Sequence, residues 1–179
     1  NSGAEANEGA FKLARLYGKT ISKKKSVILS LDSSFHGRTL AAITATGQKK
    51  YQEGLDPLPS HFKHVKPNDI ADLRKKANED VCAIIVEFLQ GEGGINEVSR
   101  EFATTLTELQ NKYGFLVIAD EIQAGIGRTG KFFSYEHLDL KPDIVVIAKA
   151  IGGGLPLGAI LGGPRIANVF SYGNHGTTF

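Results

Sequence analysis

Three short apolar segments of the sequence each lead into a residue that can carry proton or covalent chemistry. These are Val81–Val86 before Glu87, residues 115–119 before Asp120, and Ile144–Ala148 before Lys149. Open α/β sheets bind ligands beyond the carboxyl ends of their strands, so two carboxylates and a lysine at neighbouring strand ends could form one site. Among apolar neighbours Lys149 is expected to be partly buried, which would make its neutral amine available for Schiff-base chemistry.

Each of these residues also has a structural interpretation. Lys149 could be a strand-end lysine that reaches solvent, and Asp120 could cap the turn that follows it. Glu87 could pair with Glu92 in acid–base chemistry, although a turn separates them and neither needs that role. Taken together, Lys149 and Asp120 match the division of labour in pyridoxal phosphate (PLP) enzymes. There a lysine holds the aldehyde carbon and a carboxylate keeps the pyridine nitrogen protonated.

A phosphate-bearing cofactor also needs an anion site, and the start of the chain offers one. Ser2 opens a predicted helix with the capping pattern S-x-x-E, so the N–H groups of Gly3 and Ala4 could face a phosphate. The same pattern more often marks a helix cap without a ligand. Further on, Phe35 could stack on a planar cofactor and Arg38 could grip a carboxylate, or they could be a core residue and a surface charge.

Other motifs are weaker. Residues 125–130 (GIGRTG) match the dinucleotide pattern G-x-G-x-x-G, but they begin several residues after the strand and no convincing helix follows. The P-loop pattern fails because Phe132 occupies the position of the magnesium-binding Ser or Thr. The five His show no metal spacing, so no metal is predicted, and His61 and His64 are expected at the surface.

The elements that must position these residues alternate between helix and strand. Helices are expected from Ser2 to Gly18, over 38–46 and 69–78, and from Ser99 to Gly114; strands are expected over 27–31, 81–89, 115–119, 144–148 and 157–161, with a Pro-rich loop over 51–68. The continuous β-branched segments are typical of parallel strands covered on both faces. The sequence therefore predicts a three-layer α/β fold with a mostly parallel central sheet.

Composition excludes several classes of protein. The chain has 179 residues with 21 Gly, one Cys and no Met or Trp, which suits one domain or a large piece of one. A net charge of +2 indicates no nucleic-acid partner. The lone Cys82 argues against a disulfide framework and for a reducing compartment, and no segment approaches the ~20 apolar residues of a membrane span. We therefore expect a cytoplasmic protein without a membrane partner.

A set of short motifs occurs in a fixed order along the whole chain. They are residues 1–8 (NSGAEANE), 35–39 (FHGRT), 90–94 (QGEGG), 119–123 (ADEIQ), 148–150 (AKA), 152–154 (GGG) and 175–179 (HGTTF). This set resembles the class III aminotransferases of the fold-type I PLP group, most closely the acetylornithine aminotransferases. The ordered set is far more specific than any one motif. The resemblance implies that residues 1–179 are the PLP-binding large domain, and that an N-terminal segment and a C-terminal small domain are absent from this chain.

The resemblance also implies roles for individual residues. Lys149 would bind the aldehyde carbon of PLP and shuttle the proton, Asp120 would pair with the pyridine nitrogen, and Gln123 would reach the ring hydroxyl. The remaining cofactor contacts would come from Phe35 and Ile122 on the two ring faces and from Gly3 and Ala4 on the phosphate.

Substrate contacts and a second subunit are implied in the same way. Arg38 would hold the substrate α-carboxylate, and Glu92 would pair with an arginine further along the chain. Thr178 would reach the phosphate of a neighbouring subunit, with Thr177 near that subunit's substrate. The family is expected to form homodimers with composite sites.

The implied reaction is transfer of an amino group from N-acetylornithine, or a related ω-amino donor, to 2-oxoglutarate in arginine biosynthesis, giving a semialdehyde and glutamate. Ornithine, succinylornithine and 4-aminobutyrate aminotransferases share nearly all of these residues and remain alternatives. An NAD-binding oxidoreductase fragment that uses residues 125–130 is an alternative of another class. A catalytically inactive domain that acts only as a binding partner is a third.

Overall fold

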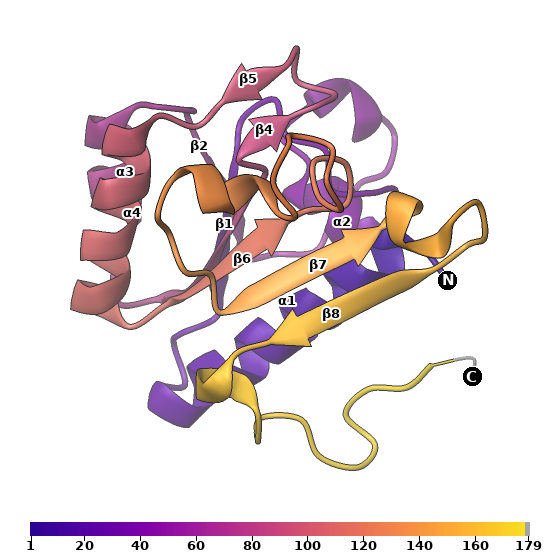
Figure 1. Cartoon of the computed structure of the whole chain (residues 1–179). Coiled ribbons are helices and arrows are strands. Elements are labelled where there is room, and N and C mark those ends of the chain that lie inside the picture. Colours follow the sequence, from indigo (N-terminus) through magenta and orange to yellow (C-terminus); the bar gives the residue numbers. More distant parts are fainter. Residues whose placement is uncertain (178–179) are drawn as a thin grey trace.

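One central sheet of six strands organises the computed structural model, which describes residues 1–177. In order across the sheet the strands are β2 (Phe62–Val65), β1 (Val27–Leu31), β3 (Val81–Val86), β6 (Leu116–Asp120), β7 (Ile144–Ala148) and β8 (Gly158–Gly162). The first five strands are parallel, and β8 is antiparallel to β7. The predicted mostly parallel sheet is confirmed (Figure 1).

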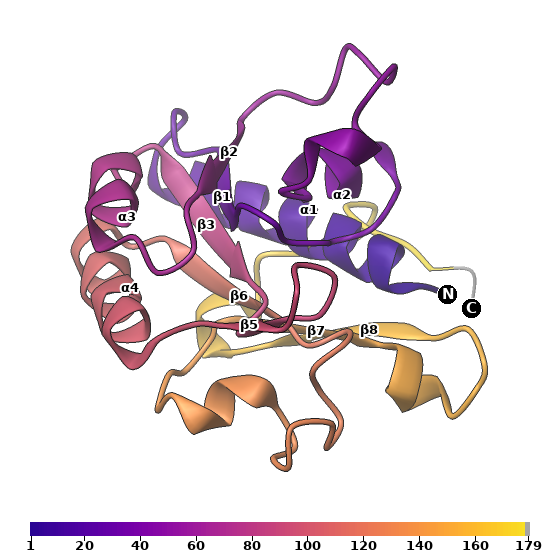
Figure 2. The ribbon, with the colours of Figure 1, turned by 90° about the horizontal axis from the view of Figure 1, so that it is seen from above.

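Helices cover both faces of this sheet (Figure 2). α1 (Gly3–Ile21) and α2 (Leu40–Ala45) lie on one face, and α3 (Ile70–Lys76) and α4 (Arg100–Tyr113) lie on the other. β3 shows why two cores form, because its side chains alternate in direction along the strand. Ala83 and Ile85 join the core beneath α1, while Ile84 and Val86 join the core beneath α3 and α4.

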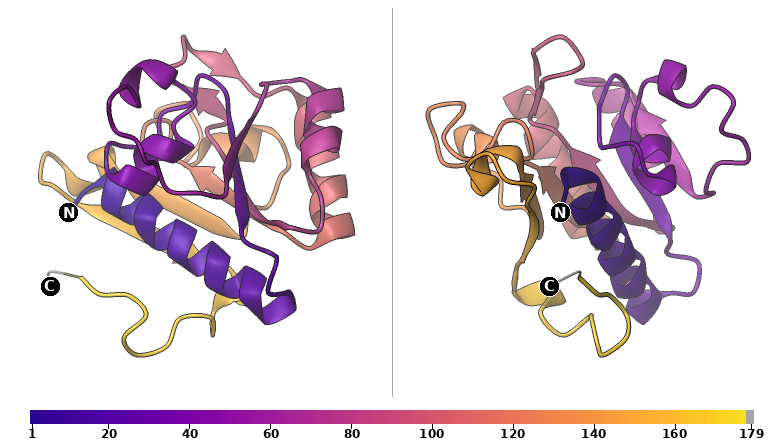
Figure 3. Two further views of the ribbon diagram at one scale, coloured as in Figure 1. Left: turned by 180° about the vertical axis from the view of Figure 1, so that it is seen from behind. Right: turned by 90° about the vertical axis from the view of Figure 1, so that its right-hand side faces the viewer.

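The long helix α1 crosses the sheet and begins at the carboxyl ends of the parallel strands (Figure 3). Its start is as predicted, because the Ser2 side chain accepts a hydrogen bond from the Glu5 N–H at 3.2 Å. Its predicted end at Gly18 is wrong, since the helix continues to Ile21. Gly18 serves close packing instead, because a Cβ there would overlap the carbonyl oxygen of Lys25.

The segment predicted as a loop over residues 51–68 contains the edge strand β2, so this prediction is wrong for Phe62–Val65. Phe62 packs edge-to-face on Phe11 at 5.4 Å between ring centroids, and half-buried His64 contacts the Ala45 carbonyl oxygen. The expectation that His64 is a surface residue is therefore wrong, whereas His61 is exposed. Prolines on both sides of a four-residue strand mask the local signal of a segment that only tertiary contacts stabilise.

Element boundaries differ from the predictions at other places. The strand predicted over 81–89 ends at Val86, and Leu89–Gln90 forms a separate strand β4 that pairs with β5 (Asn96–Glu97). α2 begins two residues later than predicted. α4 does end at Gly114, whose φ of 68° lies in the left-handed region that favours glycine.

Within residues 1–177, no helix is both long enough and apolar enough to cross a membrane.

Candidate active site

The sheet brings the predicted strand-end residues to one edge. Asp120 ends β6, and Lys149 directly follows the neighbouring strand β7. Glu87 directly follows β3, the neighbour of β6 on its other side. Because these strands are parallel, their carboxyl ends meet on the side where α1 begins (Figure 1). The prediction that a lysine and two carboxylates share one region is confirmed.

Lys149 lies at the start of a short 3-10 helix, Lys149–Gly152. Its φ of 49° is in the left-handed region, which is uncommon for a residue with a side chain. By solvent-accessible area the residue is exposed, and the expected partial burial applies only to its amine group. The surrounding protein nevertheless removes part of the hydration of the amine, and this lowers the pKa of Lys149 against the opposing charge of Asp120.

Asp120 is buried, and both of its carboxylate oxygens accept hydrogen bonds. Oδ2 lies 2.7 Å from His36 Nδ1 and accepts from Asn7 Nδ2 at 3.0 Å. Oδ1 accepts from the backbone N–H of Ile122 at 3.1 Å. Burial disfavours the charged imidazole of His36, but the hydrogen bond to Asp120 and the charge of Asp120 outweigh it and raise the pKa of His36. The pair therefore favours a carboxylate beside a protonated imidazole.

Glu87 lies behind the same region and is 2% exposed. Its Oε2 accepts a hydrogen bond from the Phe35 N–H at 2.8 Å. Burial raises the pKa of Glu87 to about 7, opposed first by the charge of His36 and reinforced by that of Asp120. Glu87 is thus a buried carboxyl that supports the segment around Phe35.

A cavity of about 430 Å³ lies beside these strand ends. Its wall contains most of the residues predicted to bind a cofactor or substrate, together with an apolar edge: Gly3, Ala4, Phe35, His36, Arg38, Ile122, Gln123, Lys149, Leu155 and Leu157. Asp120 lies behind this wall, where it contacts His36 and Ile122. The volume is in the range of cavities that bind small molecules and cofactors.

The start of α1 forms one end of this cavity. The first N–H groups of a helix have no acceptor within the helix, so the amides of Gly3 and Ala4 give this end a partial positive charge. Gly3 also packs closely against Ile122, because a Cβ at this position would lie 2.7 Å from Ile122 Cδ1. The combination of free amides, a helix dipole and little side-chain bulk suits an anion such as a phosphate.

Two aromatic rings shape the wall near Phe35. Phe35 packs against Tyr51 with 5.7 Å between ring centroids, and the guanidinium carbon of Arg38 lies 5.2 Å from the Tyr51 ring centroid. Arg38 is exposed, and the cation–π contact holds its charge at the cavity. Phe35 and Arg38 therefore both lie in the wall of the cavity.

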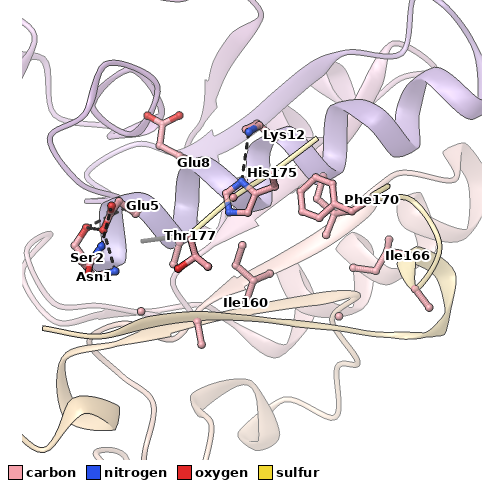
Figure 4. Close-up of a pocket in the computed structure, with 17 residues that line it drawn as sticks. Asn1, Ser2, Glu5, Glu8, Lys12, Ile160, Ile166, Phe170, His175 and Thr177 are labelled. Atoms are coloured by element: carbon pink, nitrogen blue, oxygen red, sulfur yellow. Dashed lines mark hydrogen bonds and ion pairs between the residues drawn. The ribbon is translucent and has the colours of Figure 1, made fainter. Parts of the chain in front are cut away.

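The structure does not bring every predicted residue into this cavity. Glu92 is exposed and lies outside its wall, although its charge acts on Lys149. Thr177 lines a different cavity of about 810 Å³ between α1, β8 and residues 166–177 (Figure 4). There His175 stacks on Phe170, and its Nδ1 lies 3.3 Å from Lys12 Nζ. Thr178 lies outside the described residues.

The larger cavity is the less suitable candidate for the chemistry. Its wall comes from α1, from β8 and from residues 166–177, and it includes none of the residues that end the parallel strands. The smaller cavity contains Lys149 and the free amides of α1. We therefore place the candidate active site at the smaller cavity.

Sequence reasoning missed several residues that support the site. Asn7 and His36 hold Asp120, but their contacts join positions far apart in the chain. Glu121 was noted only as part of a motif. It is fully buried and accepts three hydrogen bonds, from the Ser134 N–H, the Ser134 hydroxyl and the Tyr135 N–H. A polar residue inside the apolar stripe of α1 was the one local signal that pointed to Asn7.

Glu121 also explains the glycine-rich segment that follows. Its hydrogen bonds return the chain toward β6, and residues 125–130 form turns closed by bonds such as Gly130 N to Gly127 O at 3.1 Å. The helix that a dinucleotide site requires directly after G-x-G-x-x-G is absent here; the segment leads into a short 3-10 helix, Ser134–His137. The dinucleotide interpretation is not favoured.

The fold and the site together define a class of protein. A mostly parallel sheet in three layers, a lysine and a buried aspartate on neighbouring strands, and an anion-binding helix start are the parts of a PLP-dependent enzyme of fold-type I. A family model described as aminotransferase class-III matches residues 1–179. The chain belongs to the class-III aminotransferase family, whose cofactor is PLP.

Curated relatives and solved structures agree with this assignment. The chain is 47% identical over 179 residues to an acetylornithine aminotransferase of Aquifex aeolicus, and the match covers all of this chain and 48% of that protein. It is 49% identical over 179 residues to an acetylornithine aminotransferase of Bacillus cereus, with all of this chain and 45% of that protein covered. An ornithine aminotransferase from Toxoplasma gondii superposes with a TM-score of 0.93 at 31% identity, covering 100% of this chain and 44% of that one. The chain thus spans about half the length of the relatives it matches.

Proposed function

We propose that residues 1–179 are the PLP-binding large domain of an aminotransferase that moves an amino group from N-acetylornithine, or a related ω-amino donor, to 2-oxoglutarate. The products are a semialdehyde and glutamate. The observation that carries the proposal is the placement of Lys149 and the buried Asp120 at adjacent strand ends beside one cavity. The names of the relatives at 47–49% identity support acetylornithine as the donor and a place in arginine biosynthesis.

The residues present fit PLP. The cavity of about 430 Å³ has free helix amides at one end and Lys149 in its wall, and Gly3 gives Ile122 the space that a side chain would take. Two buried polar atoms beside Asp120, Asn7 Oδ1 and His36 Nε2, have no partner among the described residues. A polar cofactor next to Asp120 matches this environment.

Each side chain would then have one task. Gly3 and Ala4 would bind the phosphate through their N–H groups, and Phe35 and Ile122 would hold the two faces of the ring. Gln123 would reach the ring hydroxyl. Asp120, held by three donors, would keep the pyridine nitrogen protonated.

Lys149 carries the proton transfer in this proposal. When bound, PLP supplies an electron sink that stabilises negative charge at the substrate carbon. The lowered pKa of Lys149 increases the fraction of neutral amine, which can take a proton from the substrate and return it at another position. The charges of Asp120, Glu92 and Glu87 limit that shift.

The substrate would be recognised at the exposed side of the cavity. Arg38 offers a planar guanidinium for the donor's α-carboxylate, oriented by its contact with Tyr51. Glu92 lies close enough for its charge to act on Lys149, and we propose that it pairs with an arginine elsewhere in the whole protein.

We further propose a cytoplasmic homodimer with composite sites. Leu155 is 75% exposed and Leu157 is 42% exposed at the edge of the cavity, and a partner subunit would remove this apolar surface from water. Thr177 lies in a separate cavity of its own chain, which suits a residue that serves the neighbouring subunit. The assignment of Thr178 to the neighbouring subunit's phosphate rests only on the resemblance to the family.

A substrate panel tests the proposed function. The purified holoenzyme is assayed for glutamate formation from 2-oxoglutarate with N-acetylornithine, N-succinylornithine, ornithine or 4-aminobutyrate as donor, and Lys149→Ala serves as the blank. We expect the highest kcat/KM with N-acetylornithine. A higher value with another donor would overturn the donor assignment but keep the class. A colourless protein that makes no glutamate and binds NAD would overturn the aminotransferase itself.

A further inference from the structure

Asn7 is a buried polar residue in the apolar stripe of α1, one helical turn before Ala10. Its side chain is fully buried and faces β6 rather than solvent. The single nitrogen Nδ2 donates two hydrogen bonds, one to the His36 carbonyl oxygen at 2.8 Å and one to Asp120 Oδ2 at 3.0 Å. Both amide hydrogens are therefore used, and they join three segments of the chain.

These two hydrogen bonds fix the Asp120 carboxylate relative to its neighbours. Oδ2 is held between Asn7 and His36, and Oδ1 is held by the Ile122 N–H. With donors on both oxygens, the carboxylate plane cannot rotate without breaking a charge-assisted hydrogen bond. The bond to the His36 carbonyl also holds the wall segment that follows Phe35 against α1.

Burying the Asn7 amide is energetically unfavourable, which indicates that its two N–H groups have a role. Asn7 Oδ1 has no partner among the described residues, and an unpaired buried acceptor is destabilising. A side chain that served only to fill the core between α1 and β6 would be apolar, as Ala6 and Ala10 are. The cost is offset if the two N–H groups are needed to orient Asp120.

We propose that Asn7 is a positioning residue that orients the Asp120 carboxylate toward the pyridine nitrogen of PLP. This inference rests on the proposed function, because Asp120 has that partner only in a PLP enzyme. Loss of the Asn7 amide would leave Asp120 Oδ2 with the His36 hydrogen bond alone and would release the His36 carbonyl, so the carboxylate could shift relative to the ring nitrogen. PLP would then bind more weakly, and its ring nitrogen would be protonated in a smaller fraction of the molecules.

The chain contains a matched control for this test. Gln110 on α4 also uses a buried side-chain amide to donate to a buried aspartate, Asp143 Oδ2, at 2.7 Å. Asp143 directly precedes β7 and so lies at the opposite end of the sheet from Lys149. Asn7→Leu and Gln110→Met each keep the approximate shape of the side chain and remove the donor. Asn7→Ser is a milder variant, because it keeps one hydrogen-bond donor and adds no apolar side chain as Asn7→Leu does.

The experiment has two readouts besides turnover. The dissociation constant of PLP is measured by titrating each apoenzyme, and the ¹⁵N chemical shift of ¹⁵N-labelled PLP reports the protonation of its ring nitrogen. For Asn7→Leu we expect about tenfold weaker PLP binding or more, the loss typical of a hydrogen bond to a charged group, and a ¹⁵N shift toward the unprotonated position. Asn7→Ser should lie between Asn7→Leu and wild type, and Gln110→Met should match wild type in both readouts.

Each other result has a defined meaning. Wild-type PLP affinity and ¹⁵N shift in Asn7→Leu would overturn the positioning role, as would an equal change in Gln110→Met. If both Asn7 variants fail to fold while Gln110→Met folds, the residue is structural and the proposal is wrong. If the wild-type protein neither binds PLP nor forms glutamate, the proposed function fails first, and this outcome is distinct from the others.

Discussion

Glu87 Oε2 accepts a hydrogen bond from the backbone N–H of Phe35 at 2.8 Å, which ties the end of β3 to the wall of the active-site cavity. The carboxyl is buried, and His36 and Asp120 lie close enough for their charges to act on it. The segment that presents Phe35 therefore depends on a buried ionisable group that comes from another strand.

Glu87→Gln should change how stability depends on pH. Burial raises the pKa of Glu87 from its ordinary value of 4.5 to about 7, so the folded protein binds this proton more tightly than the unfolded chain does. The contribution of Glu87 to the free energy of unfolding is therefore full below pH 4.5 and is lost as pH rises through about 7. Urea unfolding at several pH values should show Glu87→Gln gaining stability relative to wild type across this window.

The exposed Glu97 provides the control for that measurement. Glu97→Gln should change the free energy of unfolding by less than about 0.5 kcal/mol at every pH. A difference between Glu87→Gln and wild type that stays constant from pH 4.5 to 8 would contradict the raised pKa.

Lys149→Ala should remove turnover without unfolding the protein. The residue is exposed, so its truncation should leave the melting temperature nearly unchanged. The rate of glutamate formation should fall by at least about 10²-fold, because the proton-transfer group is lost. Lys149→Arg is the matched variant, since it keeps the charge but offers no neutral amine. Substantial transamination by either variant would show that Lys149 is not the proton carrier, and borohydride treatment of wild type should fix PLP on Lys149.

The sequence predicts the parts of this fold whose signals are local. Long helices with caps at Ser2 and Ser99, and the apolar strands before Glu87 and Lys149, follow from composition and periodicity. β2 escapes prediction because a half-exposed edge strand between prolines has a weak pattern of its own. Its pairing with β1 and the packing of Phe62 on Phe11 determine it instead.

The same distinction explains what was predicted of the site. Lys149 and Asp120 could be identified because residues at strand ends of an α/β sheet have a known geometric meaning. The hydrogen bonds of Asn7 and His36 to Asp120 join residues 113 and 84 positions apart, and no spacing rule reports such contacts. The extent to which Lys149 is exposed could not be predicted either, because apolar neighbours in sequence do not cover a side chain that follows the last residue of a strand.

His36→Leu should destabilise the protein, and more so at low pH. The hydrogen bond to Asp120 raises the pKa of His36 despite its burial, so its stabilising contribution is full below 6.5 and is lost as pH rises through the higher folded-state value. Removing one partner of a buried pair typically costs about 3–5 kcal/mol. Unfolding measured at pH 6 should show a larger loss for His36→Leu than unfolding at pH 9. The exposed His137 gives the matched variant His137→Leu, and a loss for His36→Leu that grows with pH would contradict the assignment.

Gly91→Ala should disturb Gln123 while leaving the fold intact. A Cβ at Gly91 would overlap Gln123 Oε1, which is the end of a flexible side chain and can move at little cost in stability. If Gln123 contacts the ring hydroxyl of PLP, its displacement should weaken PLP binding, as measured by titration of the apoenzyme. Gln123→Ala alone should weaken binding to a similar extent. In the double variant the Gly91 substitution should then add nothing, because the atom it displaces is gone. Additive losses in the double variant would show that Gly91 affects the cofactor by another route.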